Sequence, residues 1–317
     1  MSTAITNRKV AVIGSGFVGS ACAFSLMESR LFSEMVLIDV DRDRAEGEAL
    51  DISHGIPFFD PMTIYAGDYS DLADASIVVV TAGANQKPGE SRLDLVQKNV
   101  AIFKSIIPQI TASGFNGVLL VVSNPVDILT HVALKLSGLP ESQVLGSGTV
   151  LDSARLKHTL GEKLGVDPRQ VHARIIGEHG DSEIALWSSS NIAGIPMDTF
   201  FALRGINNAK ETMDEIAADV RDSAYEIIKK KRATYFCIAS SVKRICECIV
   251  RDEKSIMTVS NHMHGMHGIE DIALSMPAIV GRTGVEYQLP IVLNEEENRR
   301  LQVSANMLRK ILAEVEL

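Results

Sequence analysis

The sequence predicts an α/β fold in which a doubly wound parallel sheet is followed by a mixed α+β domain. Short, nearly continuous apolar runs alternate with longer amphipathic stretches along the first half of the chain. After about residue 148 this rhythm changes to mixed strands and long helices. The chain has 317 residues, 46% of them hydrophobic, which suffices for two closely packed domains. We therefore predict domains at residues 1–147 and 148–317.

The strands predicted for the first domain are apolar and rich in β-branched residues, as strands buried on both faces are. They are residues 9–14, 35–40, 62–67, 76–83, 117–124 and 143–148. Helical patterns between them cover residues 17–29, 42–53, 92–111 and 126–137. Such a sheet binds ligands at the carboxyl ends of its strands, so polar residues that follow these strands are candidate site residues.

The second domain is predicted to begin with a helix at 150–164 and to end with a charged helix from about 294. Between them we expect strands at 171–177, 184–188, 255–260, 277–281 and 285–290, and long helices at 208–230 and 234–251.

Composition limits the partners and the compartment. The formal net charge of −9 argues against nucleic acid and anionic membranes as partners. There is no apolar run of the ~18 residues that a membrane span needs. The first residues lack the basic start and cleavage site of a signal peptide, so we expect a cytoplasmic protein. The four cysteines, Cys22, Cys237, Cys246 and Cys248, are interpreted as reduced thiols.

A glycine motif at the first strand predicts a dinucleotide site. The stretch "VAVIGSGFVGSACAFSLM" (10–27) has the pattern G-x-G-x-x-G between a strand and a helix. Gly14 permits the tight turn, Gly16 leaves room for a pyrophosphate, and Gly19 lets the helix approach the strand. The helix N-terminus, with Phe17 and Val18, offers free N–H groups to phosphates. This is the fingerprint of a Rossmann domain.

An acidic strand end favours NAD over NADP as the cofactor. Asp39 ends the second strand in "VLIDVD" (36–41), where a carboxylate accepts both ribose hydroxyls and repels a 2′-phosphate. Ala82 and Gly83, at the end of a later strand, are predicted to line the same cofactor site. Two alternatives stay open at this point, a glycine turn in a generic α/β domain and a methyltransferase site.

Four further segments carry candidate chemistry near predicted strand ends. "TAGANQKPGESRLDL" (81–95) is a polar loop with Gln86 and Arg92, and "VVSNPVD" (121–127) places Asn124 before a helix. The helix at 150–164 places Asp152 and Arg155 on one face. "IIGEHGDSEIALW" (175–187) places a histidine among glycines and acids. Each segment also has an ordinary structural interpretation when taken singly. Arg92 is typical of a solvated loop charge, Asn124 of a helix cap, and Asp152 with Arg155 of a surface ion pair. The histidine segment is typical of a polar turn after a strand.

Together these motifs resemble the L-lactate/malate dehydrogenase family, bacterial type, over essentially the whole chain. The resemblance implies that His179 donates and accepts the proton, that Asp152 orients it, and that Arg92 stabilises charge on the reacting oxygen. It also implies that Gln86, Arg92, Asn124, Arg155 and Thr234 bind substrate, with Arg155 holding its carboxylate. Asn124 lies near the reacting oxygen and is expected to contact the cofactor as well.

The implied activity is the reversible, fermentative reduction of pyruvate to L-lactate with NADH, by a homotetramer or dimer. Within the same family, malate dehydrogenase has arginine at the position of Gln86, and a second alternative acts on bulkier 2-oxo acids. A catalytically silent dinucleotide-binding protein is the alternative from another class. The presence of His179, Asp152, Arg155 and Arg92 together speaks against it.

Three features depart from the family pattern or invite another interpretation. Where relatives bind fructose 1,6-bisphosphate with an arginine and a histidine, this chain has Lys157 and His172, so we expect weak or absent activation. Arg232 replaces a usual glycine close to Thr234. "NHMHGMHG" (261–268) contains His262, His264 and His267 without an acid at zinc spacing, so no metal site is predicted.

Overall fold

The computed structural model describes residues 8–84 and 92–315, and Gln86 lies outside this part of the chain. Its helices are α1 (Phe17–Glu28), α2 (Arg42–Ser53), α3 (Arg92–Ala112), α4 (Val126–Ser137), α5 (Val150–Leu164), α6 (Met197–Leu203), α7 (Ala209–Lys231), α8 (Phe236–Arg251) and α9 (Glu295–Ala313). Its strands are β1 (Lys9–Ile13), β2 (Glu34–Ile38), β3 (Thr63–Ala66), β4 (Ile77–Val80), β5 (Val118–Val121), β6 (Val144–Gly146), β7 (Val171–His172), β8 (Ile175–Ile176), β9 (Ile184–Ala185), β10 (Asn191–Ile192), β11 (Ile195–Pro196), β12 (Ser255–His264), β13 (Glu270–Gly281) and β14 (Gly284–Gln288).

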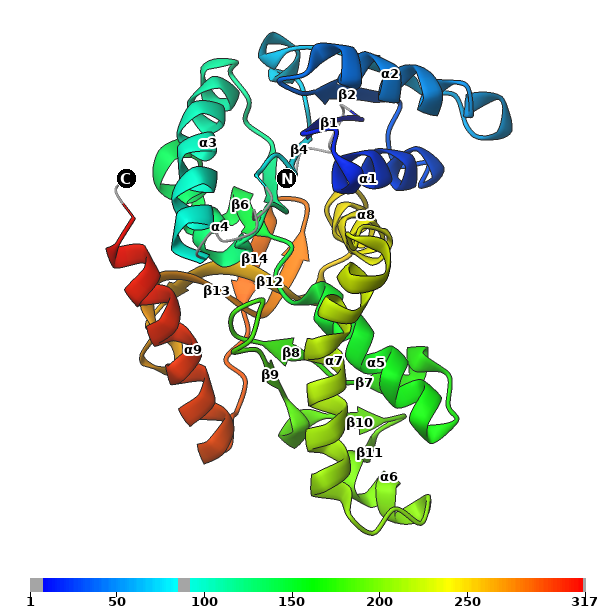
Figure 1. The fold of residues 1–317 in the computed structure, drawn as a ribbon, viewed down its shortest axis with the longest axis vertical. Coiled ribbons are helices and arrows are strands. Elements are labelled where there is room, and N and C mark those ends of the chain that lie inside the picture. Colours follow the sequence, from blue (N-terminus) through cyan, green and yellow to red (C-terminus); the bar gives the residue numbers. More distant parts are fainter. Residues whose placement is uncertain (1–7, 85–91, 316–317) are drawn as a thin grey trace.

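The central sheet follows from the apolar runs of the first half. In the described residues it has nine strands, in the order β14-β13-β12-β6-β5-β4-β1-β2-β3. The six strands from β6 to β3 are parallel, as predicted. Strands β1, β4 and β5 are buried along their whole length because helices cover both faces. Figure 1 shows α3 and α4 on one side of this sheet and α1 and α8 on the other.

The sheet does not stop at the predicted domain boundary. Strand β12 pairs antiparallel with β6 through Ser260 and Gly146, and β13 and β14 extend the sheet further. Both β12 and β13 are also longer than predicted, because they form one hairpin that runs to His264 and resumes at Glu270. Apolar periodicity identifies strands but not their partners, so the continuity of the sheet could not be seen in the sequence.

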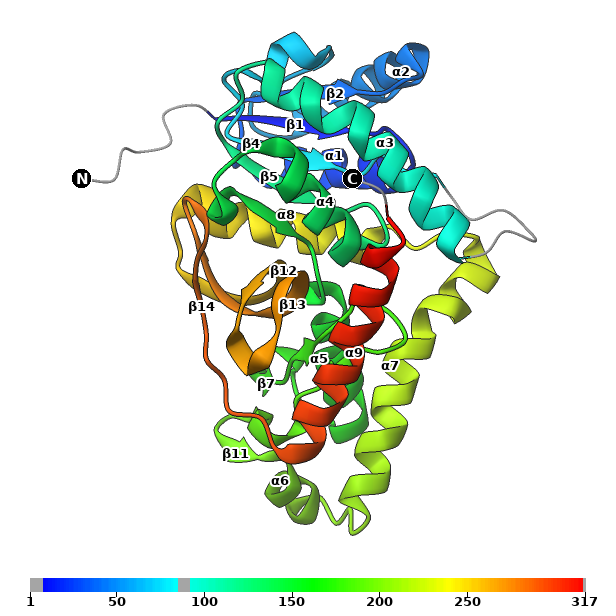
Figure 2. The ribbon, with the colours of Figure 1, turned by 90° about the vertical axis from the view of Figure 1, so that its left-hand side faces the viewer.

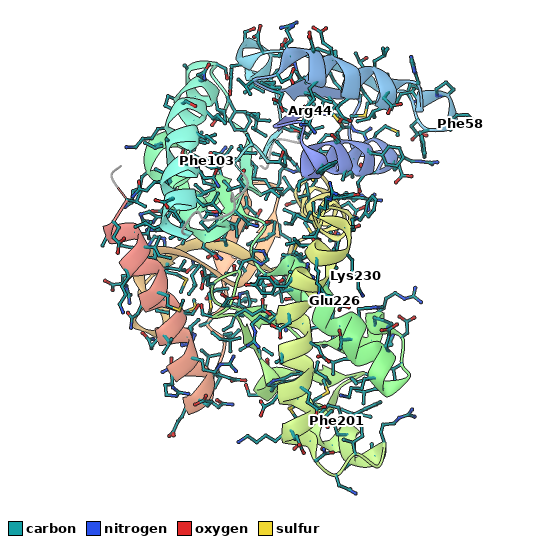
Figure 3. All side chains as sticks on the ribbon, in the orientation of Figure 1. Arg44, Phe58, Phe103, Phe201, Glu226 and Lys230 are labelled. Carbon is teal, nitrogen blue, oxygen red and sulfur yellow. The ribbon has the colours of Figure 1, made fainter. Side chains whose placement is uncertain are left out.

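The segment from β7 to α6, residues 171–203, differs most from the predictions. The run at 171–177 forms two short strands, β7 and β8, in different sheets, and β9 ends at Ala185 instead of residue 188. Strands β10 and β11 and helix α6 were not predicted. They enclose Phe201, labelled in Figure 3, in a separate hydrophobic core with α5 and α7. Strands of two residues carry too little periodicity to be recognised.

Helix α9 links the two halves (Figure 2). Near its end the carbonyl of Glu314 accepts a hydrogen bond from Gln97 on α3 at 2.6 Å, and in its middle Ser304 accepts one from the Glu178 backbone at 2.8 Å. The helix thereby fixes the loop that carries His179. Across residues 8–84 and 92–315, no helix combines the length and apolar character required to cross a membrane.

Candidate active site

The turn after β1 has the geometry that the glycine motif predicts. Gly14 has a φ of 101°, in the left-handed region, and a Cβ there would lie 2.6 Å from the Ala82 backbone nitrogen. A Cβ on Gly19 would lie 1.7 Å from the Gly14 carbonyl oxygen. A larger residue at Gly14 would push the turn after β1 away from the loop after β4, and one at Gly19 would push α1 away from β1.

The same turn leaves a cradle for a pyrophosphate. A Cβ on Gly16 would meet no described atom within 4 Å, and no side chain caps the start of α1. The free N–H groups and the helix dipole favour an anion at this position. Asp39, directly after β2, accepts hydrogen bonds from the Ser15 and Asp41 backbone nitrogens at 2.5 and 3.0 Å. These bonds hold its carboxylate at the edge of the cradle, so the residues present fit NAD.

Substituting Asp39 should change the choice between cofactors. We expect the unmodified protein to prefer NADH strongly, and Asp39→Ser to narrow the ratio of kcat/KM values for NADH and NADPH by ~10-fold or more, because a charged acceptor of ribose hydroxyls is lost. Asp41→Ser is the matched control, since Asp41 caps α2 and should leave the ratio unchanged. Equal use of both cofactors by the unmodified protein would refute the assignment of Asp39.

Asn99 on α3 joins the loops that follow β4 and β5. Its side-chain oxygen accepts a hydrogen bond from the Ala84 backbone at 2.7 Å, and its amide nitrogen donates one to the Asn124 carbonyl at 2.7 Å. Ala82, Gly83 and Asn124 are therefore held along the same edge of the sheet as Gly14. Asn99 was not predicted, because a buried polar residue within a helix gives no local signal of its partners.

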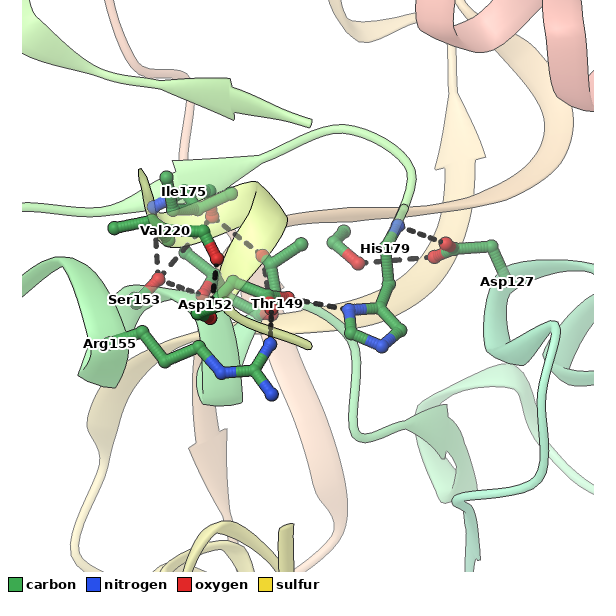
Figure 4. A network of polar contacts seen from close by, with 11 residues as sticks. Asp127, Thr149, Asp152, Ser153, Arg155, Ile175, His179 and Val220 are labelled. Atoms are coloured by element: carbon green, nitrogen blue, oxygen red, sulfur yellow. Dashed lines mark hydrogen bonds and ion pairs between the residues drawn. The ribbon is translucent and has the colours of Figure 1, made fainter. Parts of the chain in front are cut away.

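His179 and Asp152 form the central pair of the site. Helix α5 supplies Asp152, and the loop between β8 and β9 supplies His179, whose Nδ1 lies 2.5 Å from Asp152 Oδ2 (Figure 4). Burial alone would lower the pKa of His179, but the charge and hydrogen bond of Asp152 outweigh it and raise that pKa to about 9. The imidazolium is therefore favoured at neutral pH, and the ring can donate a proton.

A second buried acid fixes the backbone of His179. Asp127 on α4 accepts a hydrogen bond from the His179 backbone nitrogen at 2.8 Å and another from Ser275 on β13 at 3.1 Å. Burial raises the pKa of Asp127 to about 6. Asp127 lay inside the quoted motif "VVSNPVD", but its partner is far away in the sequence, so its role was not predicted.

Arg155 is arranged to receive an anion. Its Nη1 lies 3.1 Å from Asp152 Oδ1, one turn earlier on α5, as the spacing predicted. Its Nη2 is buried and has no hydrogen-bond partner among the described residues. Arg155, Asp152, His179 and Asn124 all line one cavity of about 300 Å³. A buried guanidinium with one unused edge in a cavity fits a substrate carboxylate.

Glu183 is a further acid of this cavity, present in the quoted motif but not singled out from the sequence. One of its carboxyl oxygens is buried without a hydrogen-bond partner in the described structure. Ligand atoms of Glu183, Asp152 and His179 lie within 4.8 Å of one another. Burial, followed by the charge of Asp152, raises the pKa of Glu183 to about 8, so it is largely neutral at pH 7.

Glu183 should therefore shape the pH profile. Ionised above about pH 8, it adds to the charges that raise the pKa of His179. The pyruvate reduction that the resemblance implies needs the imidazolium. Glu183→Gln should therefore keep the rate at pH 6 and move the alkaline fall of kcat/KM to lower pH, on the order of half to one pH unit. The measurement is kcat/KM as a function of pH from 6 to 10. Glu162→Gln, on the exposed side of α5, is the control. An unshifted alkaline limb, or a large loss at pH 6, would count against this role.

Other predicted site residues lie at the margin or outside the described structure. Arg92 is the first residue of α3, and its side chain is not described. Thr234 lies half-buried between α7 and α8 and is not among the residues that line the 300 Å³ cavity. Its neighbour Tyr235 stacks on Phe17 with ring centroids 5.6 Å apart, which brings this loop to the start of α1. Arg232 has a φ of 71° at the end of α7, a conformation that glycine adopts more easily.

The two residues considered for an effector differ in environment. Lys157 lines a separate cavity of about 520 Å³ together with Arg174 and Arg244. Burial, followed by the charge of Arg174, lowers the pKa of Lys157. His172 is exposed on β7 and does not line this cavity.

Residues 8–146 match the NAD binding domain of lactate/malate dehydrogenase, and residues 149–317 match the alpha/beta C-terminal domain of the same family. The chain belongs to the lactate/malate dehydrogenase family. This confirms the resemblance and the fold class that the sequence predicted. As a member of this family, the chain is an NAD-dependent oxidoreductase.

Individual relatives within the lactate/malate dehydrogenase family are similar over nearly their full length. L-lactate dehydrogenase of Thermoanaerobacterium saccharolyticum is 50% identical over 309 residues, which cover 98% of this chain and 99% of the relative. L-lactate dehydrogenase of Priestia megaterium is 50% identical over 303 residues, 96% and 95% of the two chains. The ligand-bound crystal structure of minor L-lactate dehydrogenase from Enterococcus mundtii has a TM-score of 0.95 and 41% identity, over 98% of this chain and 99% of its own.

Proposed function

We propose that this member of the family is an L-lactate dehydrogenase that reversibly reduces pyruvate to L-lactate with NADH in fermentation. The observation that carries the proposal is the single cavity in which His179 pairs with Asp152 beside the unused edge of Arg155. A small 2-oxo acid needs one cation for its carboxylate and one proton donor for its carbonyl oxygen. The cavity offers both.

Each residue has a distinct task in this scheme. Arg155 binds the carboxylate through Nη2 and so fixes the orientation of the carbonyl carbon. His179 gives its proton to the carbonyl oxygen during reduction and takes it back during oxidation, while Asp152 holds the ring and stabilises the imidazolium. Gly14, Gly16, Gly19 and Asp39 would hold NADH, which would supply the hydride when bound.

The remaining predicted residues complete the proposal. Arg92 stabilises the charge that develops on the reacting oxygen, and Asn124 binds that oxygen and the cofactor. Gln86 and Thr234 line the space for the substrate methyl group. Phe17, Val18, Ala82 and Gly83 complete the cofactor site.

Assembly and regulation are proposed on the family resemblance. We propose a homotetramer, with a dimer as the alternative, located in the cytoplasm. Fructose 1,6-bisphosphate is expected to activate weakly or not at all, because Lys157 lacks the planar fork of arginine and His172 is charged only when it is protonated.

Substrate choice tests the proposed function. Gln86 is neutral, so a second substrate carboxylate would lose its water without gaining a partner, at a cost on the order of 3–5 kcal/mol. In an assay of NADH oxidation, pyruvate should therefore exceed oxaloacetate in kcat/KM. Pyruvate should also exceed 2-oxoisocaproate, because the proposed space beside Gln86 and Thr234 is for a methyl group. Gln86→Arg should shift the ratio towards oxaloacetate. A preference of the unmodified protein for oxaloacetate would identify a malate dehydrogenase instead.

A further inference from the structure

Two histidines of the β12–β13 hairpin meet an acid from another part of the chain. His262 and His264 are two residues apart on β12, and the pairing with β13 shifts register between them. Glu141, in the short helical turn η3 (Glu141–Gln143) before β6, lies against both. Its Oε2 is 2.7 Å from His264 Nε2, and its Oε1 is 3.4 Å from His262 Nδ1. One ligand atom from each of the three residues lies within 4.8 Å of the other two.

The environment of His262 leaves one ring nitrogen available. Its side chain is only 11% exposed, and Nδ1 is buried with no hydrogen bond to the described residues. On the other side of the ring, Nε2 lies 3.4 Å from Asp271 Oδ1, which Lys135 also contacts at 2.8 Å. Glu141 lies equally far from Nδ1, but only the contact between Nε2 and Asp271 has the geometry of a hydrogen bond, which favours the tautomer with its proton on Nε2. The lone pair of Nδ1 then faces Glu141, as in a histidine that ligates a metal.

We propose that Glu141, His262 and His264 bind one divalent transition-metal ion, with Zn²⁺ as the preferred ion. Two imidazoles and one carboxylate suit Zn²⁺, Co²⁺ or Ni²⁺, whereas Mg²⁺ and Ca²⁺ require oxygen ligands. Three protein ligands leave a coordination position for water, and a cavity of about 490 Å³ lined by all three residues has room for it. No metal was predicted from the sequence because the missing acid, Glu141, is far upstream of the histidines.

The ion would join two segments that meet where the parallel and antiparallel parts of the sheet pair. Turn η3 leads directly into β6, and β12 is the strand that pairs with β6. Because the ion binds the folded chain, it raises the melting temperature by ~5 °C at a concentration about 100 times its Kd.

The test is metal binding by the untagged, EDTA-stripped full chain at pH 7.5. Zn²⁺ is titrated by calorimetry and Co²⁺ by its visible absorption, and melting temperatures are measured with and without Zn²⁺. We expect one ion per chain. His264→Ala and Glu141→Gln should each weaken binding by ~10–100-fold and so reduce the thermal shift to about half or less. Both side chains are about half exposed, so both variants should fold, as NADH binding would verify.

Two controls separate this site from other histidines. His158→Ala removes an exposed histidine that pairs with Glu162 on α5, and it should bind Zn²⁺ like the unmodified chain. His179→Ala disrupts the other acid–histidine cluster of the described residues, with Asp152 and Glu183, and it should also retain binding. Absence of binding, binding that survives His264→Ala and Glu141→Gln, or binding lost in His179→Ala would each overturn the proposal. The three residues would then form ion pairs only.

Discussion

Replacing His179 with alanine is expected to lower kcat for pyruvate reduction by ~10²–10⁴-fold. The variant has no group at this position to donate the proton, and Asp152 is left buried without its histidine partner. NADH should bind as before, because the proposed cofactor site lies at the turn after β1 and at Asp39. The measurements are steady-state kinetics and a fluorescence titration with NADH. Turnover close to that of the unmodified enzyme would remove His179 from the proposed mechanism.

Asp152→Asn is the companion to this experiment. It keeps the shape of the side chain but removes the charge that holds the pKa of His179 at about 9. Pyruvate reduction depends on the imidazolium, so the alkaline fall in kcat/KM should move to lower pH in this variant. Lactate oxidation depends on the neutral ring, so its rise should begin at lower pH. A purely structural role for Asp152 would lower the rate without moving either limb.

Replacing Arg155 with lysine is expected to lower kcat/KM for pyruvate on the order of 10²–10³-fold. Lysine keeps the positive charge but loses the planar fork that offers Nη2 to the substrate while Nη1 contacts Asp152. Most of the loss should appear in KM if the carboxylate is bound equally in the ground and transition states.

Arg221→Lys is the matched control for Arg155. Arg221 lines the same cavity, but it is more exposed and pairs with Asp222 at 3.2 Å. Its replacement should cost much less, since an exposed ion pair contributes little. Equal losses in the two variants would show that the guanidinium fork matters no more at Arg155 than at Arg221, and the specific role of Arg155 would be rejected.

The parts of the site that could be predicted depend on local geometry. A G-x-G-x-x-G pattern after a strand requires the turn seen at Gly14, whatever the rest of the chain does. Asp152 and Arg155 are three residues apart on a helix, so their contact follows from helical periodicity. The six parallel strands were predicted for a similar reason, because burial on both faces leaves an apolar run in each strand.

The parts that could not be predicted depend on contacts between distant segments. The bond between Asp127 and the His179 backbone, and the approach of Glu141 to His264, join residues that no local pattern relates. The burial that raises the pKa of Glu183 is likewise a property of the packed cavity. The sequence gives no reason to distinguish Glu183 from Asp181, the acid two residues earlier. In the structure, however, Asp181 accepts a hydrogen bond from the exposed Tyr225.

The unbroken sheet limits how this molecule can move. Because β6 is hydrogen-bonded to β12, the two halves are not joined by a flexible linker alone. A wide rotation between them would break the backbone hydrogen bonds between these two strands. Asp127 from the first half accepts a hydrogen bond from the backbone of His179 in the second half, so the distance between these two residues is set when the chain folds. Opening and closing of the cavity would therefore fall to surface segments. In such a motion the hydrogen bond between Asp127 and the His179 backbone would remain in place.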